Sequence, residues 1–184
     1  MKKAGLVLAL VCVLSGCGGE SGELERAMDL RAKLLQCSAC QFEAQVTADY
    51  GDGTTEFSLS CQADGAGDLS FTVAAPESIR DIAGTVRDGR VTFDGTALEF
   101  LPMADGHIAP ILAPWIFLRT LRGGNLTSAG MEGELLRLSI DDSFDDDALH
   151  LDIWLDQQDV PVRAEILYDG RRYLSLNVAG WSIV

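Results

Sequence analysis

The chain is poor in positive charge and in histidine. Its 184 residues include 14 Lys and Arg against 28 Asp and Glu, which gives a formal net charge of −14. Nucleic-acid binding draws on clustered Lys and Arg, so we expect no nucleic-acid partner. The only histidines are His107 and His150, and no spacing joins them to carboxylates as metal ligands. We therefore expect no metal site.

Common catalytic motifs are also missing. The sequence has no G-x-S-x-G nucleophile elbow, no P-loop and no recognisable pair of catalytic carboxylates. The acidic segment 141–147 offers oxygen ligands of the kind that Ca²⁺ prefers, but it lacks the glycine and the distal glutamate of a calcium-binding loop. A solvated surface loop is the favoured interpretation. We expect a folded globular protein that is not an enzyme and has no cofactor.

No hydrophobic run is long enough to span a bilayer as a helix. The longest is the 11 residues Ala4–Leu14, well short of the ~20 residues that a transmembrane helix needs. Lys2 and Lys3 precede it, and this arrangement is typical of a signal peptide. Removing residues 1–16 would leave 168 residues with a net charge of −16, enough for one domain.

The end of this leader resembles the lipobox of bacterial lipoproteins. Leu14-Ser15-Gly16-Cys17 has an apolar residue, two small residues and then cysteine. The resemblance implies that the chain is cut before Cys17, that Cys17 is diacylated on sulfur, and that the protein is anchored to the cell membrane outside the cytoplasm. An ordinary secretory signal with a chance cysteine is the alternative. Residues 17–22 are small and polar, which predicts a short lipidated tether before a domain over 23–184.

The domain begins with a helical pattern. Leu24, Ala27, Met28, Leu34 and Leu35 share one face of a helix over residues 23–36, and Ser21 is a plausible N-cap. We expect this face to pack on the core.

Beyond residue 41 the hydrophobic period changes to two, which is typical of strands. A hairpin over 41–62 is followed by further strand-like segments, and the Asp-Gly turns at 88–89, 94–95 and 169–170 favour hairpins. The pattern predicts a meandering antiparallel sheet. The expected later strands are Leu69–Val73, Ile82–Arg87, Val91–Phe93, Ala97–Leu101, Leu135–Ile140, Leu149–Leu155, Val162–Leu167 and Tyr173–Val178.

The segment Pro110–Arg122 interrupts the strands with a second helix. Proline near its start and Gly123-Gly124 after its end are typical helix boundaries. Apolar residues cover almost its whole circumference, so it must be buried or must cover something hydrophobic. These residues are Ile111, Leu112, Trp115, Ile116, Phe117, Leu118 and Leu121.

This order of elements resembles the LolA and LolB superfamily of lipoprotein-sorting and lipid-carrier proteins, in the variant found in lipoproteins of Gram-positive bacteria. The resemblance is carried by the hairpin over 41–62, by Pro76–Ile79, by Gly84–Gly89 with Val91–Phe93, and by the closing hairpin over 160–178. It implies an α+β fold: a curved antiparallel β-sheet, or half-barrel, with an N-terminal helix and a mid-chain helical plug on the concave face.

The resemblance implies a function of binding. We expect a membrane-anchored lipoprotein that holds a lipid or another apolar ligand in the concave face. Ile111, Leu112, Trp115, Phe117 and Leu118 are the expected ligand-binding wall, unless they simply pack as core. The alternative function is an envelope interaction or scaffold lipoprotein, such as one with a germination or partner-protein role, which has no ligand and uses its acidic exterior to contact a partner.

Three cysteines remain outside the leader and the lipobox. In an oxidising compartment we expect a disulfide between Cys40 and Cys61 that staples the hairpin. Counting from the turn puts Cys61 opposite Phe42 or Glu43, so this bridge needs a bulge or a longer turn. Pairing of Cys37 with Cys61 is the alternative, and the C-x-x-C spacing of Cys37 and Cys40 leaves thiol chemistry as a third possibility.

Overall fold

The computed structural model describes residues 20–51, 53–93, 96–97, 103–104, 107–145 and 148–184. The expected leader, Cys17, the first part of the tether, the turn at 94–95 and most of the strand expected over 97–101 lie outside these ranges. Within them, no helix combines the length and the apolar character required to cross a bilayer.

Helix α1, Glu20–Gln36, begins three residues earlier than predicted, so residues 20–22 of the expected tether are helical and Ser21 is no N-cap. Its buried side chains are Ala27, Leu30 and Leu34, at spacings of three and four. The predicted face was wrong for Leu24, Met28 and Leu35, which are 47%, 51% and 60% exposed. These three lie about a quarter-turn away from the buried stripe, on its flank.

Two arginines of α1 fasten the helix to the rest of the domain. Arg26 Nε is 2.7 Å from Asp159 Oδ1, in the turn after the strand that ends at Leu155. Arg31 Nε donates to the Leu121 carbonyl at 2.9 Å. Burial lowers the pKa of Arg31. The two contacts hold the helix across one end of the sheet, between its last strands and the second helix.

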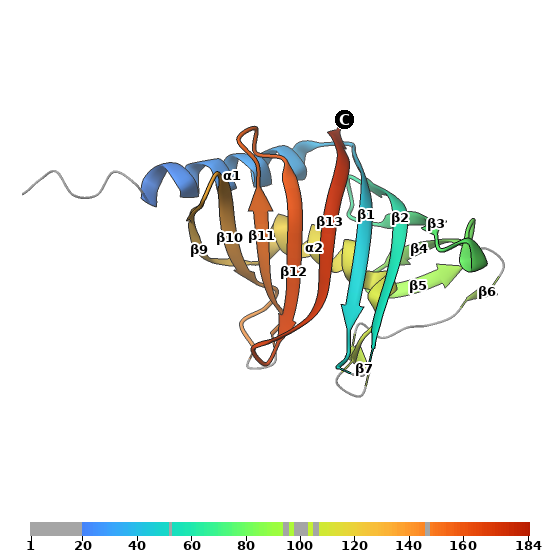
Figure 1. Ribbon diagram of the computed structural model, residues 1–184. Coiled ribbons are helices and arrows are strands. Elements are labelled where there is room, and N and C mark those ends of the chain that lie inside the picture. The colour runs from blue at the N-terminus through green and yellow to red at the C-terminus, as the bar shows by residue number, and fades with distance from the viewer. Residues whose placement is uncertain (1–19, 52, 94–95, 98–102, 105–106, 146–147) are drawn as a thin grey trace, which may run out of the picture.

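In the described residues, eleven strands form one antiparallel sheet with the order β6-β5-β4-β3-β2-β1-β13-β12-β11-β10-β9 (Figure 1). A separate pair, β7 (Met103–Ala104) and β8 (His107–Ile108), lies outside it. The sheet strands are β1 Ala39–Asp49, β2 Thr54–Asp64, β3 Leu69–Ala75, β4 Ala83–Arg87, β5 Arg90–Phe93, β6 Thr96–Ala97, β9 Asn125–Glu132, β10 Leu135–Asp141, β11 His150–Leu155, β12 Pro161–Tyr168 and β13 Arg171–Ile183.

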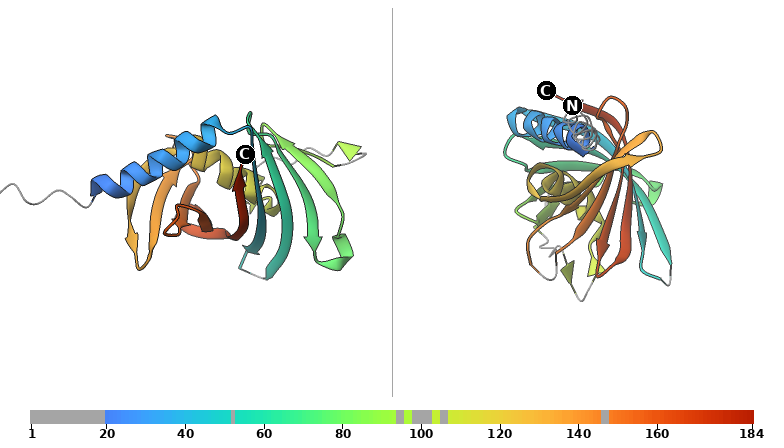
Figure 2. Two further views of the ribbon diagram at one scale, coloured as in Figure 1. Left: turned by 90° about the horizontal axis from the view of Figure 1, so that it is seen from above. Right: turned by 90° about the vertical axis from the view of Figure 1, so that its left-hand side faces the viewer.

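The predicted fold class is confirmed: the structure is α+β, with a curved antiparallel sheet that remains unclosed. Viewed along its length, the sheet bends around the two helices (Figure 2). In the described residues β6 and β9 are its two edges, and the first strand of the hairpin pairs with the last strand of the chain. Because β1 and β13 are neighbours at the centre, the two halves of the sequence form one continuous layer.

The alternation read from the sequence determines which side of each strand faces inward. In β1 the side chains of Phe42, Ala44 and Val46 are buried, while Gln41, Glu43 and Gln45 between them are exposed. The same alternation continues in β2, β3, β12 and β13. Successive residues of a strand point to opposite faces, so these buried rows together form one apolar inner surface.

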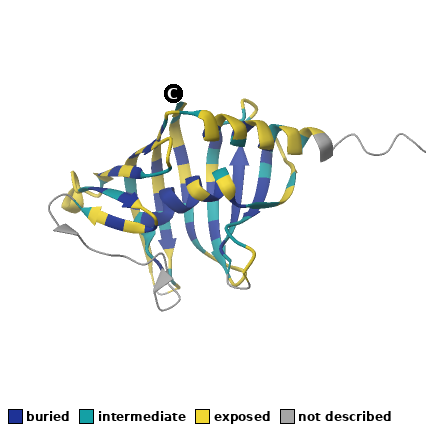
Figure 3. Cartoon of the chain, turned by 180° about the vertical axis from the view of Figure 1, so that it is seen from behind, coloured by how far each residue is buried: buried dark blue, intermediate teal, exposed yellow. Residues whose placement is uncertain are grey.

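The mid-chain helix packs against this inner surface, as expected for a plug. A 3₁₀ turn, η2 (Pro110–Leu112), leads into α2 (Ala113–Gly123), in which eight of the eleven residues are buried. The Phe117 ring lies 5.8 Å from that of Phe42 on β1, edge to face, and 6.1 Å from that of Trp181 on β13. Seen from behind, α2 is largely buried although it lies on the open side of the sheet (Figure 3). Its packing joins both halves of the sheet into one core.

Candidate functional site

A groove with an entirely apolar lining opens beside the start of the plug. We name it the apolar groove; its volume is about 350 Å³. Residues of β2, β3 and β5, of the segment between β3 and β4, and of η2 meet there. Its lining residues are Phe57, Val73, Ile79, Ile82, Phe93, Ala109, Pro110 and Ile111.

Backbone hydrogen bonds fix the rim of the apolar groove. After β3 the chain forms a 3₁₀ turn, η1 (Glu77–Ile79), and folds back on its own strand. The amide of Val73 donates to the Ile82 carbonyl at 2.9 Å, and the amide of Asp81 donates to the Val73 carbonyl at 2.9 Å. Ile79 and Ile82 are thereby held at the rim, 40% and 42% exposed. The site keeps large aliphatic side chains partly in water, an arrangement that favours an apolar ligand covering them.

Aromatic packing supports the inner wall of the same groove. The ring of Phe93 meets that of Phe71 edge to face, with their centroids 5.9 Å apart. Phe57 and Val73 belong to the inward rows of β2 and β3 and are nearly buried. The wall is therefore part of the folded core, while the rim is exposed.

A second groove lies along α2 on the side toward the end of α1. We name it the Trp115 groove; its volume is about 530 Å³, and it shares no lining residue with the apolar groove. It combines apolar and charged side chains from both helices and from the turns that follow β2 and β4. Its lining residues are Leu35, Ala66, Gly67, Asp68, Asp88, Gly89, Trp115, Leu118, Arg119, Arg122 and Gly123.

The structure distributes the five predicted ligand-binding residues over three places. Ile111 lines the apolar groove, and Trp115 and Leu118 line the Trp115 groove. Leu112 and Phe117 are fully buried in the core. Sequence reasoning missed Ile79, Ile82 and Phe93, because the segment between β3 and β4 and strand β5 meet η2 only in the folded protein.

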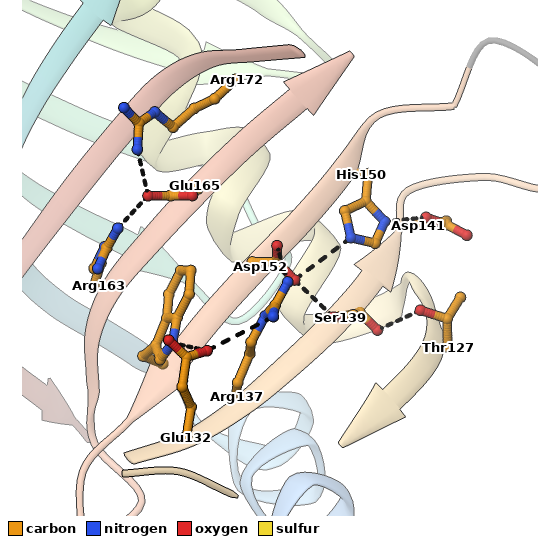
Figure 4. A network of polar contacts seen from close by, with 11 residues as sticks. Thr127, Glu132, Arg137, Ser139, Asp141, His150, Asp152, Arg163, Glu165 and Arg172 are labelled. Atoms are coloured by element: carbon orange, nitrogen blue, oxygen red, sulfur yellow. Dashed lines mark hydrogen bonds and ion pairs between the residues drawn. The ribbon is translucent and has the colours of Figure 1, made fainter. Parts of the chain in front are cut away.

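The outer face of β10, β11 and β12 carries a network of charged side chains (Figure 4). At its centre Asp152, with a side chain only 6% exposed, accepts from Arg137 Nη2 at 2.6 Å and from Ser139 Oγ at 2.7 Å. Burial alone would raise the pKa of Asp152, but the hydrogen bonds from Arg137 and Ser139, with the charges of Arg137 and His150, hold it below its ordinary value. These contacts provide the buried Asp152 carboxylate with hydrogen-bond donors from the sheet itself.

Trp154 is the aromatic part of this network. Its ring lies between two guanidinium groups, those of Arg163 at 4.5 Å and Arg137 at 5.6 Å. The indole N–H donates to Glu132 Oε2 at 3.2 Å. Stacked arginines shield the indole from water, which explains how a tryptophan on the outer face is only 5% exposed. The charged side chains of the network thus cover the Trp154 ring.

The histidine and the acidic loop do not form a metal site in the parts of the chain that the structure describes. His150 Nδ1 lies 2.7 Å from Asp141 Oδ1, and Nε2 lies 3.5 Å from Asp152 Oδ1, so the ring belongs to the outer-face network. Residues 146–147 of the acidic loop and the side chain of His107 lie outside the described residues.

The expected disulfide is not formed in this structure. Cys37, Cys40 and Cys61 are free thiols. The hairpin pairs without a bulge, which places Cys61 opposite Phe42 and Cys40 opposite Ala63. Cys40 and Cys61 are thus diagonal neighbours, whose Cβ atoms lie roughly 7 Å apart, too far for a bridge that needs about 4 Å. Burial raises the pKa of each of these two thiols to about 12.

We expect Asp152→Asn to lower the free energy of unfolding at pH 7 by about 1.5–3 kcal/mol, because it removes a charged acceptor of three hydrogen bonds. The folded-state pKa of Asp152 lies below its ordinary value of 3.8. The unfolded chain therefore binds the proton first, so this contribution is complete above that value and is lost as pH falls through the folded-state pKa. Urea unfolding at pH 7 and pH 3 measures it, with the exposed Asp145→Asn as control. An equal loss for Asp152→Asn at both pH values would contradict this account.

We also expect iodoacetamide to leave Cys40 and Cys61 unlabelled at pH 8 in the folded, reduced protein. With a pKa of about 12, only about one buried thiol in ten thousand is ionised at that pH. Half-buried Cys37 should react first, and unfolding should expose the other two. Peptide mapping by mass spectrometry gives the pattern. A peptide linked through Cys40 and Cys61 in the unreduced protein would show that the bridge forms after all.

No protein-family model matches this sequence, and no curated protein shows significant sequence similarity to it. Solved structures are similar over nearly the whole chain. A LolA superfamily protein from Nitrosomonas europaea is 12% identical, with 91% of this chain and 94% of that one covered and a TM-score of 0.45. A DUF1329 family protein from Desulfovibrio piger is 9% identical, with the same coverage and a TM-score of 0.48. The lipoprotein LppX of Mycobacterium tuberculosis is 12% identical, with 87% and 93% covered and a TM-score of 0.39. The likeness to each of these structures is one of fold alone.

Proposed function

We propose that this protein is a membrane-anchored lipoprotein outside the cytoplasm that binds a lipid, or another ligand with a hydrocarbon chain, in the apolar groove. It acts by binding and not by catalysis. The observation that carries the proposal is the groove itself: about 350 Å³ of space with an apolar lining, whose rim isoleucines stay 40% and 42% exposed.

The chemistry of the groove selects hydrocarbon. Each methylene group moved from water into an apolar site contributes about 0.8 kcal/mol to binding. The eight lining residues have apolar side chains, so a hydrocarbon chain would enter without stripping water from polar side chains. A sugar or a nucleotide would leave its own polar groups without partners there. The groove therefore suits an acyl chain and excludes polar metabolites.

The fold supplies a rigid support for such a ligand. Two walls come from the inward rows of β2 and β3, and the third comes from η2, which is continuous with the buried helix α2. The Tyr50 hydroxyl donates to the Ile108 carbonyl at 2.7 Å. This bond ties the chain just before η2 to the turn between β1 and β2. A site built on strands and a buried helix needs little ordering when a ligand binds.

The anchor part of the proposal rests on the lipobox and on the start of α1. The helix begins at Glu20, so only Gly18 and Gly19 separate it from Cys17. Three residue steps span at most about 11 Å. A chain lipidated at Cys17 would hold the domain directly at the bilayer surface, close to a supply of acyl chains.

We expect the protein to carry lipid after detergent-free purification and Ile82→Asp to reduce the bound lipid about tenfold or more. A carboxylate at the rim would have to lose water when a hydrocarbon chain binds. The matched control is Leu24→Asp, which changes an aliphatic residue of similar exposure on α1, far from the lining. Native mass spectrometry and lipid extraction give the amounts. Equal lipid in both variants, or none in the unmodified protein, would contradict the proposal and favour an interaction protein without a ligand.

The anchor has a separate test. We expect the mature protein to begin at Cys17 with the added mass of acyl chains, and Cys17→Ser to move it from the membrane fraction to the soluble one. Two or more acyl chains hold a protein firmly, whereas none of the described helices can span the bilayer. Fractionation and mass spectrometry of the N-terminal peptide measure both effects. A Cys17→Ser protein that stays with the membrane would exclude this anchor.

A further inference from the structure

We propose that the Trp115 groove is a second binding site, and that it takes an amphiphile with an anionic headgroup. The groove is larger than the apolar groove, about 530 Å³, and has no lining residue in common with it. Its lining differs in kind, because it joins apolar side chains with two guanidinium groups. The two halves of this lining match the two halves of an amphiphile.

The residues of α2 that line the groove share one face of the helix. Trp115, Leu118, Arg119 and Arg122 are spaced by three, four and seven, so their side chains lie next to one another. The opposite face, which includes Phe117, is buried against the sheet. The sequence of α2 thus combines a core-facing side with a side that presents an indole and two cations to the groove.

Arg119 is the cation that remains available for a ligand. Its guanidinium lies 5.3 Å from the centre of the Trp115 ring, and within the described part of the chain it has no hydrogen bond or ion pair. The corresponding stack on the outer face differs, because Arg163 over Trp154 is also paired with Glu165. Stacking orients the Arg119 guanidinium and leaves its N–H groups free to donate to a carboxylate or phosphate oxygen.

The second cation, Arg122, shapes the groove. Its Nη2 donates to the Gly65 carbonyl at 2.6 Å, and its Nη1 lies 3.4 Å from the Asp64 carbonyl. These contacts brace the end of α2 against the turn after β2. In that turn Gly67 has a φ of +99°, a conformation that favours glycine. Arg122 is therefore a positioning residue, and Arg119 is the residue expected to contact the headgroup.

One of the two carboxylates in the lining is paired with a third arginine. Arg87 Nε lies 2.5 Å from Asp68 Oδ2. The hydrogen bond and charge of Asp68, together with the charges of Asp64 and Asp88, raise the pKa of Arg87. Because Arg87 pairs with Asp68, the two arginines of the lining, Arg119 and Arg122, outnumber its one remaining carboxylate, that of Asp88. An anionic headgroup is favoured at that end, even though the whole protein is acidic.

The apolar half of the lining accounts for the chain of the amphiphile. Leu35 is 60% exposed at the end of α1, although it faces the Trp115 indole and Leu118 across the groove. A hydrocarbon chain lying over Leu35 would remove that side chain from water, and it would meet Trp115 and Leu118, which are already buried. The headgroup chemistry is shared by fatty-acid carboxylates, phospholipid phosphates and free phosphate, and only the first two bring a chain.

The test measures binding of dodecyl phosphate, dodecyl maltoside and inorganic phosphate to the full mature chain by calorimetry, below the micellar range. We expect dodecyl phosphate to bind, and Arg119→Gln to weaken its binding about tenfold. Arg163→Gln removes an arginine–tryptophan stack on the outer face and should leave binding unchanged. Inorganic phosphate alone should bind at least a hundredfold more weakly, because the chain supplies most of the affinity. Thermal melting confirms that each variant is folded.

Repeating the titration with the Ile82→Asp variant distinguishes binding in the Trp115 groove from binding in the apolar groove. Binding of dodecyl phosphate that survives Ile82→Asp and is lost with Arg119→Gln supports the second site, whether or not the apolar groove binds lipid. Loss with Ile82→Asp alone would overturn the second site and leave the proposed function standing. In the Ile82→Asp variant, dodecyl maltoside binding as tightly as dodecyl phosphate, or Arg119→Gln without effect, would equally overturn it.

Discussion

Both grooves depend on the packing of α2 against the inner face of the sheet. Phe117 packs against both Phe42 of β1 and Trp181 of β13, at the point where the first and last strands of the chain meet. This contact fixes η2 at one end of the helix and the Trp115 face along its side. If α2 were displaced, the apolar groove would lose Pro110 and Ile111, and the Trp115 groove would lose one wall.

The size of the helices explains why space remains on the concave side. Eleven paired strands span roughly 50 Å at about 4.8 Å per strand, whereas the eleven residues of α2 extend only about 16 Å. Helix α1 adds about 25 Å across one edge, over the strands from β9 to β13 (Figure 2). The two helices together cannot cover the inner face. The two grooves lie where the inner face is left uncovered, one at the start of the plug and the other between the helices.

Local patterns predicted the elements well, because they depend on neighbouring residues. Alternating burial in β1 and β2 follows directly from the period of two, and the turn at Asp88-Gly89 joins β4 to β5 as expected. Strand β9 was missed because little of it is buried, so its sequence hardly alternates. The buried face of α1 was partly wrong because the position of a helix on its neighbours is a tertiary property. Leu24, Met28 and Leu35 fit a helical stripe as well as Leu30 and Leu34 do.

The sites were harder to predict than the elements for the same reason. The apolar groove draws its lining from segments between residues 57 and 111, and the Trp115 groove from segments between 35 and 123. Neither set has a spacing that a sequence pattern could show. The one local signal was the pair Trp115 and Arg119, which are four residues apart on a helix. Because apolar residues cover almost the whole helix, this pair did not stand out in the sequence. The expected disulfide depended on a bulge or a longer turn in the first hairpin, and the hairpin pairs without one, which leaves Cys61 opposite Phe42.

The two faces of the sheet have different physical roles. On the outer face of β10 to β12, Arg137 pairs with Asp152, Arg172 pairs with Glu165, and stacked arginines cover the Trp154 indole. Such a surface leaves little for a ligand, because its polar groups already have partners and its apolar groups are shielded. On the concave side the opposite holds, since Ile79 and Ile82 are exposed without a cover and Arg119 is stacked without an anion. Among the described residues, the side chains that still lack partners or cover thus lie beside the plug. The charged network of the outer face stabilises the curved sheet on which both grooves are built.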